Sequence, residues 1–283
     1  MKIGFLTGYS KEIVAFARQA GFGSLELSAN PGSSFDPQKL TARELGAIQQ
    51  TLDDAGIEVS AVGSYFNHLD PDPEKRRFWA KHFTALMDLA VKMGVGVVCT
   101  FAGRVPNCDI PDSIPEFRKV FSKHAKRAED KGLKIAFENC PMFSRWPFYG
   151  NNIAYKPEAF DLMFDAVDSP ALGLEYDPSH FYWLHIDYID MIQRYGERIY
   201  HVHAKDTEIM YDRFAEEGIY GKGWWRYRIP GWGEVDWQKV FMTLNDVGYT
   251  GNLDIEHEDP VFHGDRHHEG LVLGLKHLQQ FVA

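Results

Sequence analysis

The chain has 283 residues, a formal net charge of −10, 45% hydrophobic residues and 25% charged residues. This balance is typical of a soluble globular protein, and the negative charge disfavours nucleic acid as a partner because a polyanion would be repelled. No apolar run approaches the roughly 18 residues needed to cross a bilayer, and three cysteines without CxxC spacing do not form a disulfide framework. We expect a cytoplasmic protein with no membrane or nucleic-acid partner; a homo-oligomer stays open.

A helix, a glycine and a short apolar strand recur in this order along the chain. The glycines at positions 21, 56, 94 and 132 are 35, 38 and 38 residues apart. Glycine just past a helix supplies the left-handed residue that ends it. Strands are expected at residues 2–6, 24–27, 57–62, 95–98, 133–137, 172–176, 199–202 and 252–255. Strands that alternate with helices predict an α/β fold, and we predict a single (β/α)8 TIM barrel domain over residues 1–283.

Helix signals agree with this repeat. Residues 41–44, Thr-Ala-Arg-Glu, form a capping box before a helix that runs to Ala55. The longest helix is expected from about Asp72 to Met93, and Pro157 begins another. A doubly wound open sheet is the alternative. It is disfavoured because the turn after the first strand, residues 7–10, lacks a GxGxxG motif.

The segment from Thr207 to Trp237 is expected to be a long, irregular loop, because six of its residues are glycine or proline. Its tryptophans and tyrosines argue against disorder. We expect this loop to close over the barrel mouth, with Trp225 against a sugar ring and Arg226 or Arg228 on hydroxyl groups or a phosphate. The alternative is an apolar patch between subunits.

Ionisable residues stand where four successive strands end. Glu138 ends the fifth strand, Asp177 follows the sixth, His203 the seventh and Glu256 the eighth. The carboxyl ends of barrel strands meet at one mouth, and a carboxylate there is costly to desolvate unless it is paired or bound to a cation. Taken singly, each could instead cap the following helix. Three carboxylates and one imidazole could bind one divalent ion, and oxygen-rich sites favour Mn²⁺, Mg²⁺ or Co²⁺ over Zn²⁺.

Other polar residues near these strand ends have two interpretations each. His201 points the same way as His203, so it either lines the interior below the metal or is a core histidine. Lys205 and Asp206 are expected to form an ion pair or to support His203. Cys99 and Cys140 are expected to be small buried residues.

Four motifs together resemble the sugar phosphate isomerase/epimerase family of xylose isomerase-like TIM barrels. They are Phe-Glu138-Asn-Cys-Pro, Tyr-Asp177-Pro-Ser-His180, His-Val-His203-Ala-Lys-Asp and Ile-Glu256-His-Glu-Asp. The resemblance implies one divalent metal, with Mn²⁺ favoured, on Glu138, Asp177, His203 and Glu256. It also implies that His180 binds a substrate oxygen and that Glu138 and Glu256 exchange protons with the substrate.

The resemblance implies a metal-dependent sugar isomerase or epimerase, which abstracts a proton alpha to the carbonyl of a ketose or related keto-sugar through a metal-stabilised enediolate. The alternative is a lyase or dehydratase that acts on a keto-inositol or 3-keto-glycoside by the same chemistry. Either enzyme would have a small sugar or polyol as its partner. His68 either contacts this substrate or caps a helix.

Two departures from the family pattern weigh against ketose 3-epimerisation. Ile209 stands where the tagatose-epimerase branch has an arginine that orients the ketose, and Ser144 stands where a further acid is expected. A DNA-repair phosphodiesterase on the same barrel needs more histidines on the third and fourth strands, and residues 100–103 offer none. A non-catalytic sugar-binding barrel is a further alternative.

Overall fold

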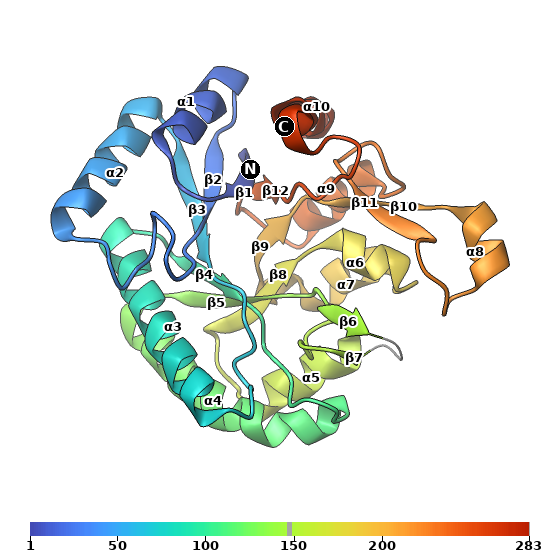
Figure 1. Cartoon of the computed structure of the whole chain (residues 1–283), viewed down its shortest axis with the longest axis horizontal. Coiled ribbons are helices and arrows are strands. Elements are labelled where there is room, and N and C mark those ends of the chain that lie inside the picture. Colours follow the sequence, from blue (N-terminus) through green and yellow to red (C-terminus); the bar gives the residue numbers. More distant parts are fainter. Residues whose placement is uncertain (146–148, 283) are drawn as a thin grey trace.

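In the computed structural model, which describes residues 1–145 and 149–282, eight parallel strands close into a barrel (Figure 1). Each strand pairs with its neighbours in chain order, and the last pairs with the first. The predicted TIM barrel is therefore confirmed. The strands are β1 (Ile3–Thr7), β2 (Ser24–Ser28), β3 (Glu58–Gly63), β4 (Val97–Thr100), β5 (Lys134–Glu138), β8 (Leu172–Tyr176), β9 (Ile199–His203) and β12 (Leu253–Ile255).

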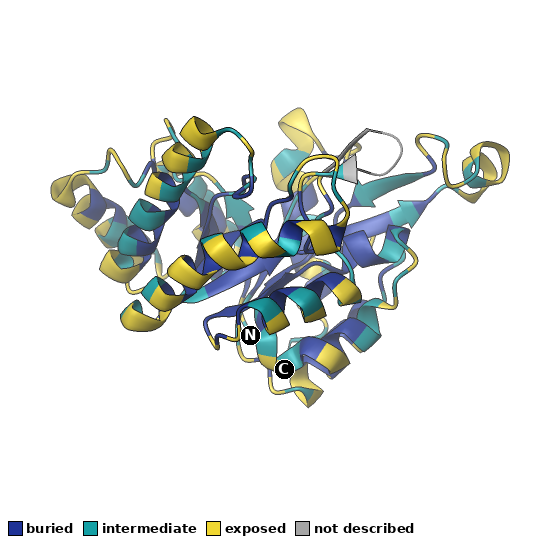
Figure 2. Ribbon diagram, turned by 90° about the horizontal axis from the view of Figure 1, so that it is seen from below, coloured by how far each residue is buried: buried dark blue, intermediate teal, exposed yellow. Residues whose placement is uncertain are grey.

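Helices surround the barrel, with their exposed faces outward and the strands buried inside them (Figure 2). The expected capping box closes the start of α2, and the four spaced glycines have φ values between 68° and 90° at helix ends. The longer helices are α1 (Lys11–Ala20), α2 (Ala42–Ala55), α3 (Pro73–Met93), α4 (Ile110–Lys131), α5 (Pro157–Ala166), α7 (Tyr188–Tyr195), α9 (Trp237–Asp246) and α10 (His267–Leu278). None of the helices in the described ranges is both long and apolar enough to span a bilayer.

The barrel interior differs in composition from the layer between barrel and helices. Apolar side chains such as Val14, Phe83 and Leu244 fill the outer layer. Inside the barrel a small cluster holds only Ala61, Cys99 and Ala136 as buried apolar residues. Because these inward residues are small, the interior has room for polar side chains at the strand ends.

The segment between Thr207 and Trp237 is more regular than expected. Strand β10 (Asp206–Ile209) pairs antiparallel with β11 (Trp225–Arg228), and the short helix α8 (Tyr211–Glu217) lies between them. The hairpin extends from one side of the barrel in Figure 1. A second small hairpin joins β6 (Phe143–Arg145) to β7 (Tyr149–Gly150).

The Asp206 carboxylate holds the base of the large hairpin. It accepts hydrogen bonds from the backbone N–H groups of Thr207, Gly231 and Val235 and from the indole of Trp237. The expected Lys205–Asp206 ion pair is therefore wrong, because the Asp206 carboxylate is occupied by the loop that returns to α9. Of the six glycines and prolines that predicted irregular structure, three lie in that returning loop and three lie between α8 and β11.

Candidate metal centre

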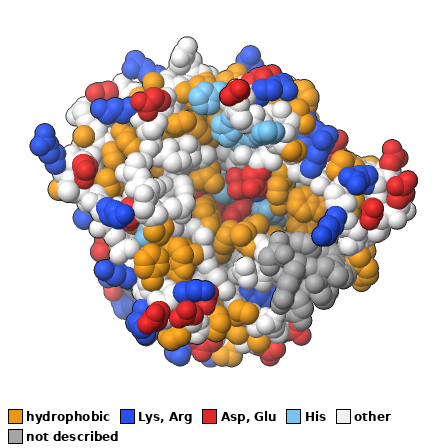
Figure 3. Space-filling model, viewed as in Figure 1, with side chains coloured by type: hydrophobic (Ala, Val, Ile, Leu, Met, Phe, Trp, Pro, Cys, Tyr) orange, Lys and Arg blue, Asp and Glu red, His pale blue; other side chains and the backbone are white. Residues whose placement is uncertain are grey.

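The structure brings together the four residues predicted at the strand ends. Potential ligand atoms of Glu138, Asp177, His203 and Glu256 all lie within 4.8 Å of one another. Acidic side chains gather in a hollow at the centre of the face shown in Figure 3, with histidine close by. Successive side chains of a strand point to opposite faces, so the inward positions of β5 and β9 carry Glu138 and His203 to this mouth.

Asp177 combines the two interpretations offered for the strand-end acids. Its Oδ1 accepts a hydrogen bond of 2.8 Å from the backbone N–H of Ser179 and so caps α6 (Pro178–Trp183). Its Oδ2 is buried, accepts no hydrogen bond, and faces Lys205 Nζ and His180 Nε2, each 3.2 Å away. One carboxylate oxygen therefore orients the side chain, and the other is available to a ligand.

The charge and the unsatisfied atoms of this group fit a divalent cation. His203 Nδ1 is also buried without a hydrogen bond, and it lies 3.2 Å from Glu256 Oε2 and 3.6 Å from Glu138 Oε1. Buried polar atoms nearly always have a hydrogen-bond partner, and these two instead face charged side chains, an arrangement that a divalent cation bound to both atoms would satisfy. Three carboxylates and one imidazole are donors that hard and borderline divalent ions accept.

A buried lysine lies directly against this group. Lys205 Nζ is 2.5 Å from Glu256 Oε2, 3.2 Å from Asp177 Oδ2 and 3.1 Å from Glu258 Oε2. Burial alone would lower the pKa of Lys205, but these carboxylates raise it well above its ordinary value. Lys205 is therefore a cation that holds two of the four candidate ligands in place.

His180 also faces the candidate metal centre. Its Nε2 lies 3.3 Å from Glu138 Oε1 and 3.2 Å from Asp177 Oδ2, and its Nδ1 is 2.9 Å from the hydroxyl of Tyr227. Burial alone would lower the pKa of His180, but Cys140 and Asp177 raise it to about 10. The position of Tyr227 on the hairpin thus determines how the imidazole points into the mouth.

The two cysteines expected to be buried differ. Cys99 is buried in the barrel interior, as predicted. Cys140 is only partly buried, and its thiol belongs to a group with Glu138 and His180 in which the ligand atoms lie within 4.8 Å of one another. The expectation of a small buried residue is therefore wrong for Cys140, which contributes a thiol to the mouth.

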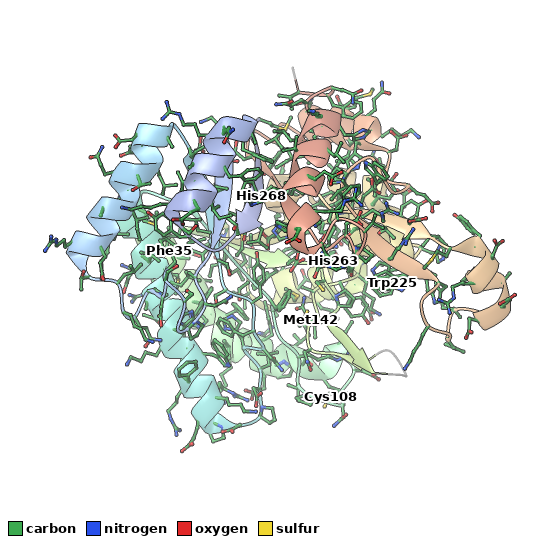
Figure 4. All side chains as sticks on the ribbon, turned by 45° about the horizontal axis from the view of Figure 1, so that its top comes forward. Phe35, Cys108, Met142, Trp225, His263 and His268 are labelled. Carbon is green, nitrogen blue, oxygen red and sulfur yellow. The ribbon has the colours of Figure 1, made fainter. Side chains whose placement is uncertain are left out.

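The hairpin presents different residues on its two faces. Trp225 and Tyr227 share one face, where Trp225 stacks on Trp183 with ring centroids 4.5 Å apart. Figure 4 shows Trp225 on this hairpin. Arg226 alternates to the other face and pairs with Glu208 at 2.7 Å. The structure therefore places Arg226 on the face of β11 opposite Tyr227, and its predicted substrate contact stays a prediction.

Arg228 behaves in the same way as Arg226. Its guanidinium contacts Glu208 and lies 2.8 Å from Asp259. Both arginines of β11 are thus engaged by carboxylates on the face away from Tyr227. Ile209, which departs from the family pattern, is buried in an apolar cluster with Trp183 and Trp224. Ser144 lies outside the residues whose side chains are described.

The structure places His68 away from the other predicted site residues. Its ring packs against Phe66, Phe83 and Phe121 at centroid distances of 4.2, 4.8 and 4.9 Å, and its Nε2 is 3.0 Å from Thr100 Oγ1. It does not cap α3, since Asp72 does so. The helix-cap interpretation of His68 is therefore wrong, and its ring packs between the barrel and the helices α3 and α4; its substrate contact stays a prediction.

A second layer of buried polar residues lies behind His203, where it joins the predicted interior residue His201 to three carboxylates that the sequence did not single out. His201 Nε2 is 3.1 Å from Asp254 Oδ2 and 3.2 Å from Glu26 Oε2. Burial and the charge of Glu26 raise the pKa of Glu175 to about 7. Glu26, Glu175 and Asp254 stand at inward positions within apolar strands, and that alternation is the signal that could have identified them.

Comparisons with known proteins agree with the architecture. The chain is 26% identical to the uncharacterized protein YfiH of Bacillus subtilis, with 88% of each chain covered. It is 22% identical to inosose dehydratase of Geobacillus kaustophilus, over 79% of this chain and 75% of that protein.

Solved structures share the fold at low sequence identity. A xylose isomerase domain protein from Planctomyces limnophilus has a TM-score of 0.76 at 19% identity, covering 99% of this chain and 96% of that one. D-psicose 3-epimerase from Clostridium cellulolyticum H10 has a TM-score of 0.73 at 16% identity, with 99% of both chains covered. The IOLI protein, solved with a zinc atom, has a TM-score of 0.75 at 18% identity over the full length of both chains.

Residues 14–281 match the family described as xylose isomerase-like TIM barrel, and the match spans nearly the whole chain. Together with the closed eight-stranded barrel, this match shows that the chain belongs to the xylose isomerase-like TIM barrel family.

Proposed function

We propose that this protein is a divalent-metal-dependent isomerase or epimerase that removes a proton next to the carbonyl of a ketose or related keto-sugar. The observation that carries the proposal is the group formed by Glu138, Asp177, His203 and Glu256 at the barrel mouth. Family membership supports enzymatic activity, since relatives include dehydratases and similar folds include epimerases.

The two glutamates are suited to exchange protons with a substrate bound between them. Glu138 ends β5 and Glu256 follows β12, and the strands β8 and β9 lie between these two in the barrel. The carboxylates therefore approach the centre from different directions, as removal and return of a proton on two sides of a carbon require. A bound divalent ion supplies the positive charge that stabilises the oxyanion formed when the proton leaves.

Other residues of the mouth orient these groups. His180 donates a hydrogen bond to a substrate oxygen, with its ring held by the Tyr227 hydroxyl at 2.9 Å. Lys205 holds Glu256 at 2.5 Å and so fixes one acid–base group. Trp225, stacked on Trp183, offers an apolar face beside the mouth to the C–H face of a sugar. Rigid placement of reacting groups supplies a large share of catalysis in such sites.

We favour Mn²⁺ as the metal, with Mg²⁺ or Co²⁺ next. Three of the four donors are carboxylates, which suit harder ions better than the sulfur and nitrogen donors typical of zinc sites. The zinc atom in the related IOLI structure makes Zn²⁺ the competitor to be measured.

A lyase that eliminates water or an aglycone from a keto-inositol or a 3-keto-glycoside is the second candidate. It is favoured by the relatives named inosose dehydratase and by the apolar Ile209, buried with Trp183 and Trp224. Proton abstraction is common to both reactions. They differ in whether a leaving group stands beta to the carbanion.

The test uses metal-free protein reloaded with Mn²⁺ and a panel of ketoses, keto-inositols and 3-keto-glycosides in D₂O. Deuterium on carbon in an isomeric product supports the isomerase, and a product lighter by water or by the aglycone supports the lyase. Absence of both on the whole panel, with metal bound, would favour a non-catalytic sugar-binding barrel.

A further inference from the structure

The two ring nitrogens of His203 have different surroundings. Nδ1 faces the candidate metal centre, 3.2 Å from Glu256 Oε2. Nε2 points the other way, 2.7 Å from Glu26 Oε2 on β2 and 3.0 Å from Glu175 Oε1 on β8. All three side chains are fully buried, so no water competes for these contacts. Only one nitrogen of a neutral imidazole carries a proton, so these neighbours determine which nitrogen can bind a metal.

We propose that Glu26 is a positioning residue: it accepts the Nε2–H of His203 and thereby fixes the tautomer whose Nδ1 lone pair faces the metal. This inference rests on the proposed function, because it concerns a ligand of the same centre. A carboxylate that holds the distal nitrogen of a metal-binding histidine orients the ring and increases its basicity.

The fold holds the Glu26 carboxylate in a fixed orientation. Its second oxygen, Oε1, accepts a hydrogen bond of 2.5 Å from the Tyr65 hydroxyl. Gly63 leaves the space for this pair: a Cβ there would lie 2.6 Å from Glu26 Oε1 and 2.9 Å from the Tyr65 ring. A chain of contacts therefore runs from Tyr65 through Glu26 to His203, and each member is held by packing.

Glu26 is better placed than Glu175 for this role. The Nε2 of His203 lies 2.7 Å from Glu26 Oε2 and 3.0 Å from Glu175 Oε1, so the shorter contact is with Glu26. Both oxygens of Glu175 lie near the Tyr65 hydroxyl, at 3.1 and 3.0 Å, but the single proton of that hydroxyl goes to the closer Glu26 Oε1. Glu175 is therefore a neighbour that closes the pocket around the Nε2–H group.

The experiment measures Mn²⁺ affinity by calorimetry on metal-free wild type and on the variants Glu26→Ala and Glu26→Gln. Loss of such a second carboxylate weakens metal binding about 10- to 100-fold, which we expect for Glu26→Ala. Glu26→Gln retains an acceptor oxygen without the charge, so we expect a smaller loss. If Glu26→Ala does not fold, a measurable loss in Glu26→Gln carries the test, and wild-type affinity in that variant overturns the inference.

Asp254→Asn is the matched control. Asp254 is a fully buried carboxylate of the same interior, but it contacts His201, Ser24 and Ser60 rather than His203. A merely structural role for buried carboxylates would weaken Mn²⁺ binding equally in Asp254→Asn and Glu26→Ala. We expect wild-type affinity in Asp254→Asn, and equal losses would overturn the proposal.

A second readout separates this inference from the proposed function. Long-range ¹⁵N–¹H spectra of the metal-free protein report whether His203 Nε2 carries a proton, which we expect in wild type, with partial loss of that proton in Glu26→Ala. If wild type bound no metal, the proposed function would fail while the tautomer measurement still tested Glu26. If wild type bound metal and Glu26→Ala had the wild-type affinity and tautomer, the role of Glu26 alone would fail.

Discussion

Two groups of buried histidines in this protein have opposite surroundings. Inside the barrel, Cys140 and Asp177 raise the pKa of His180 to about 10, and Asp254 and Glu26 raise that of His201 to about 10, even though burial alone would lower both. Between the barrel and α3 and α4, aromatic rings surround His68 and His124, and burial lowers the pKa of His124 to about 4. Burial is similar in both places, so the charge of the neighbours decides whether a histidine is available for chemistry or serves in packing.

The largest expected effect is the loss of one acid–base group inside the barrel. We expect Glu138→Gln to lower turnover about 10³-fold, since a positioned acid or base contributes roughly 10²- to 10⁴-fold. Turnover is measured as deuterium incorporation with saturating Mn²⁺. The control is Glu208→Gln, on the outer face of the hairpin, which should keep turnover within about twofold of wild type. Equal turnover in both variants would contradict the assignment.

A matched pair of substitutions tests the comparison directly. His180→Gln should lower kcat/KM about 10²-fold even under conditions where the protein is fully folded, since this imidazole faces the mouth. His68→Ala should do the opposite: it removes a ring packed on Phe66 and Phe83, at a cost of about 2–4 kcal/mol of stability. Steady-state kinetics and urea unfolding measure the two effects. A loss of activity in His68→Ala without a loss of stability would show that His68 contacts the substrate, as the sequence predicted.

Acid should destabilise the folded protein through His124, which lies between the barrel and the helices α3 and α4. The folded protein holds His124 neutral down to a pKa of about 4, whereas the unfolded chain takes up the proton near 6.5. Stability is therefore fully present above pH 6.5 and falls as pH decreases toward 4, by about 3 kcal/mol at 1.36 kcal/mol per pKa unit.

The variant His124→Gln should lose this part of the pH dependence. The free energy of unfolding, measured with urea at pH 7 and pH 4.5, should differ by about 2–3 kcal/mol less between the two pH values than in wild type. Carboxylates elsewhere titrate in both proteins, so the comparison between proteins isolates His124. An unchanged pH dependence would show that His124 already accepts a proton in the folded state.

The smallest effect is expected at Arg226, which pairs with Glu208 on the outer face of the hairpin and remains partly exposed. Arg226→Gln should change stability by less than about 1 kcal/mol, as exposed ion pairs contribute little. We expect KM to stay within about twofold of wild type. A tenfold rise in KM would show that Arg226 reaches the substrate after all.

The barrel was predictable because its signals are local. Glycines 35 and 38 residues apart end helices, and apolar strands follow them, so the eight units could be recognised in order. The four candidate ligands were predictable because ionisable residues at strand ends must converge when strands are parallel.

The remaining site features depend on contacts that spacing does not encode. His68 and His180 both follow strands, and only the packing of α3 and α4 shows that one of them faces aromatic rings. The position of the Arg226 side chain depends on which face of the β10–β11 hairpin it occupies, and the sequence predicted a loop in place of that hairpin. Glu26 lies within an apolar strand, where its partner His203 is 177 residues away in sequence.

Metal content by mass spectrometry tests the central claim most directly. Protein stripped of metal, reloaded with Mn²⁺ and passed through a desalting column should contain one equivalent of manganese in wild type and far less in Asp177→Asn and Glu256→Gln. Wild type without bound metal, or both variants with a full equivalent, would contradict a divalent ion at the mouth of this barrel.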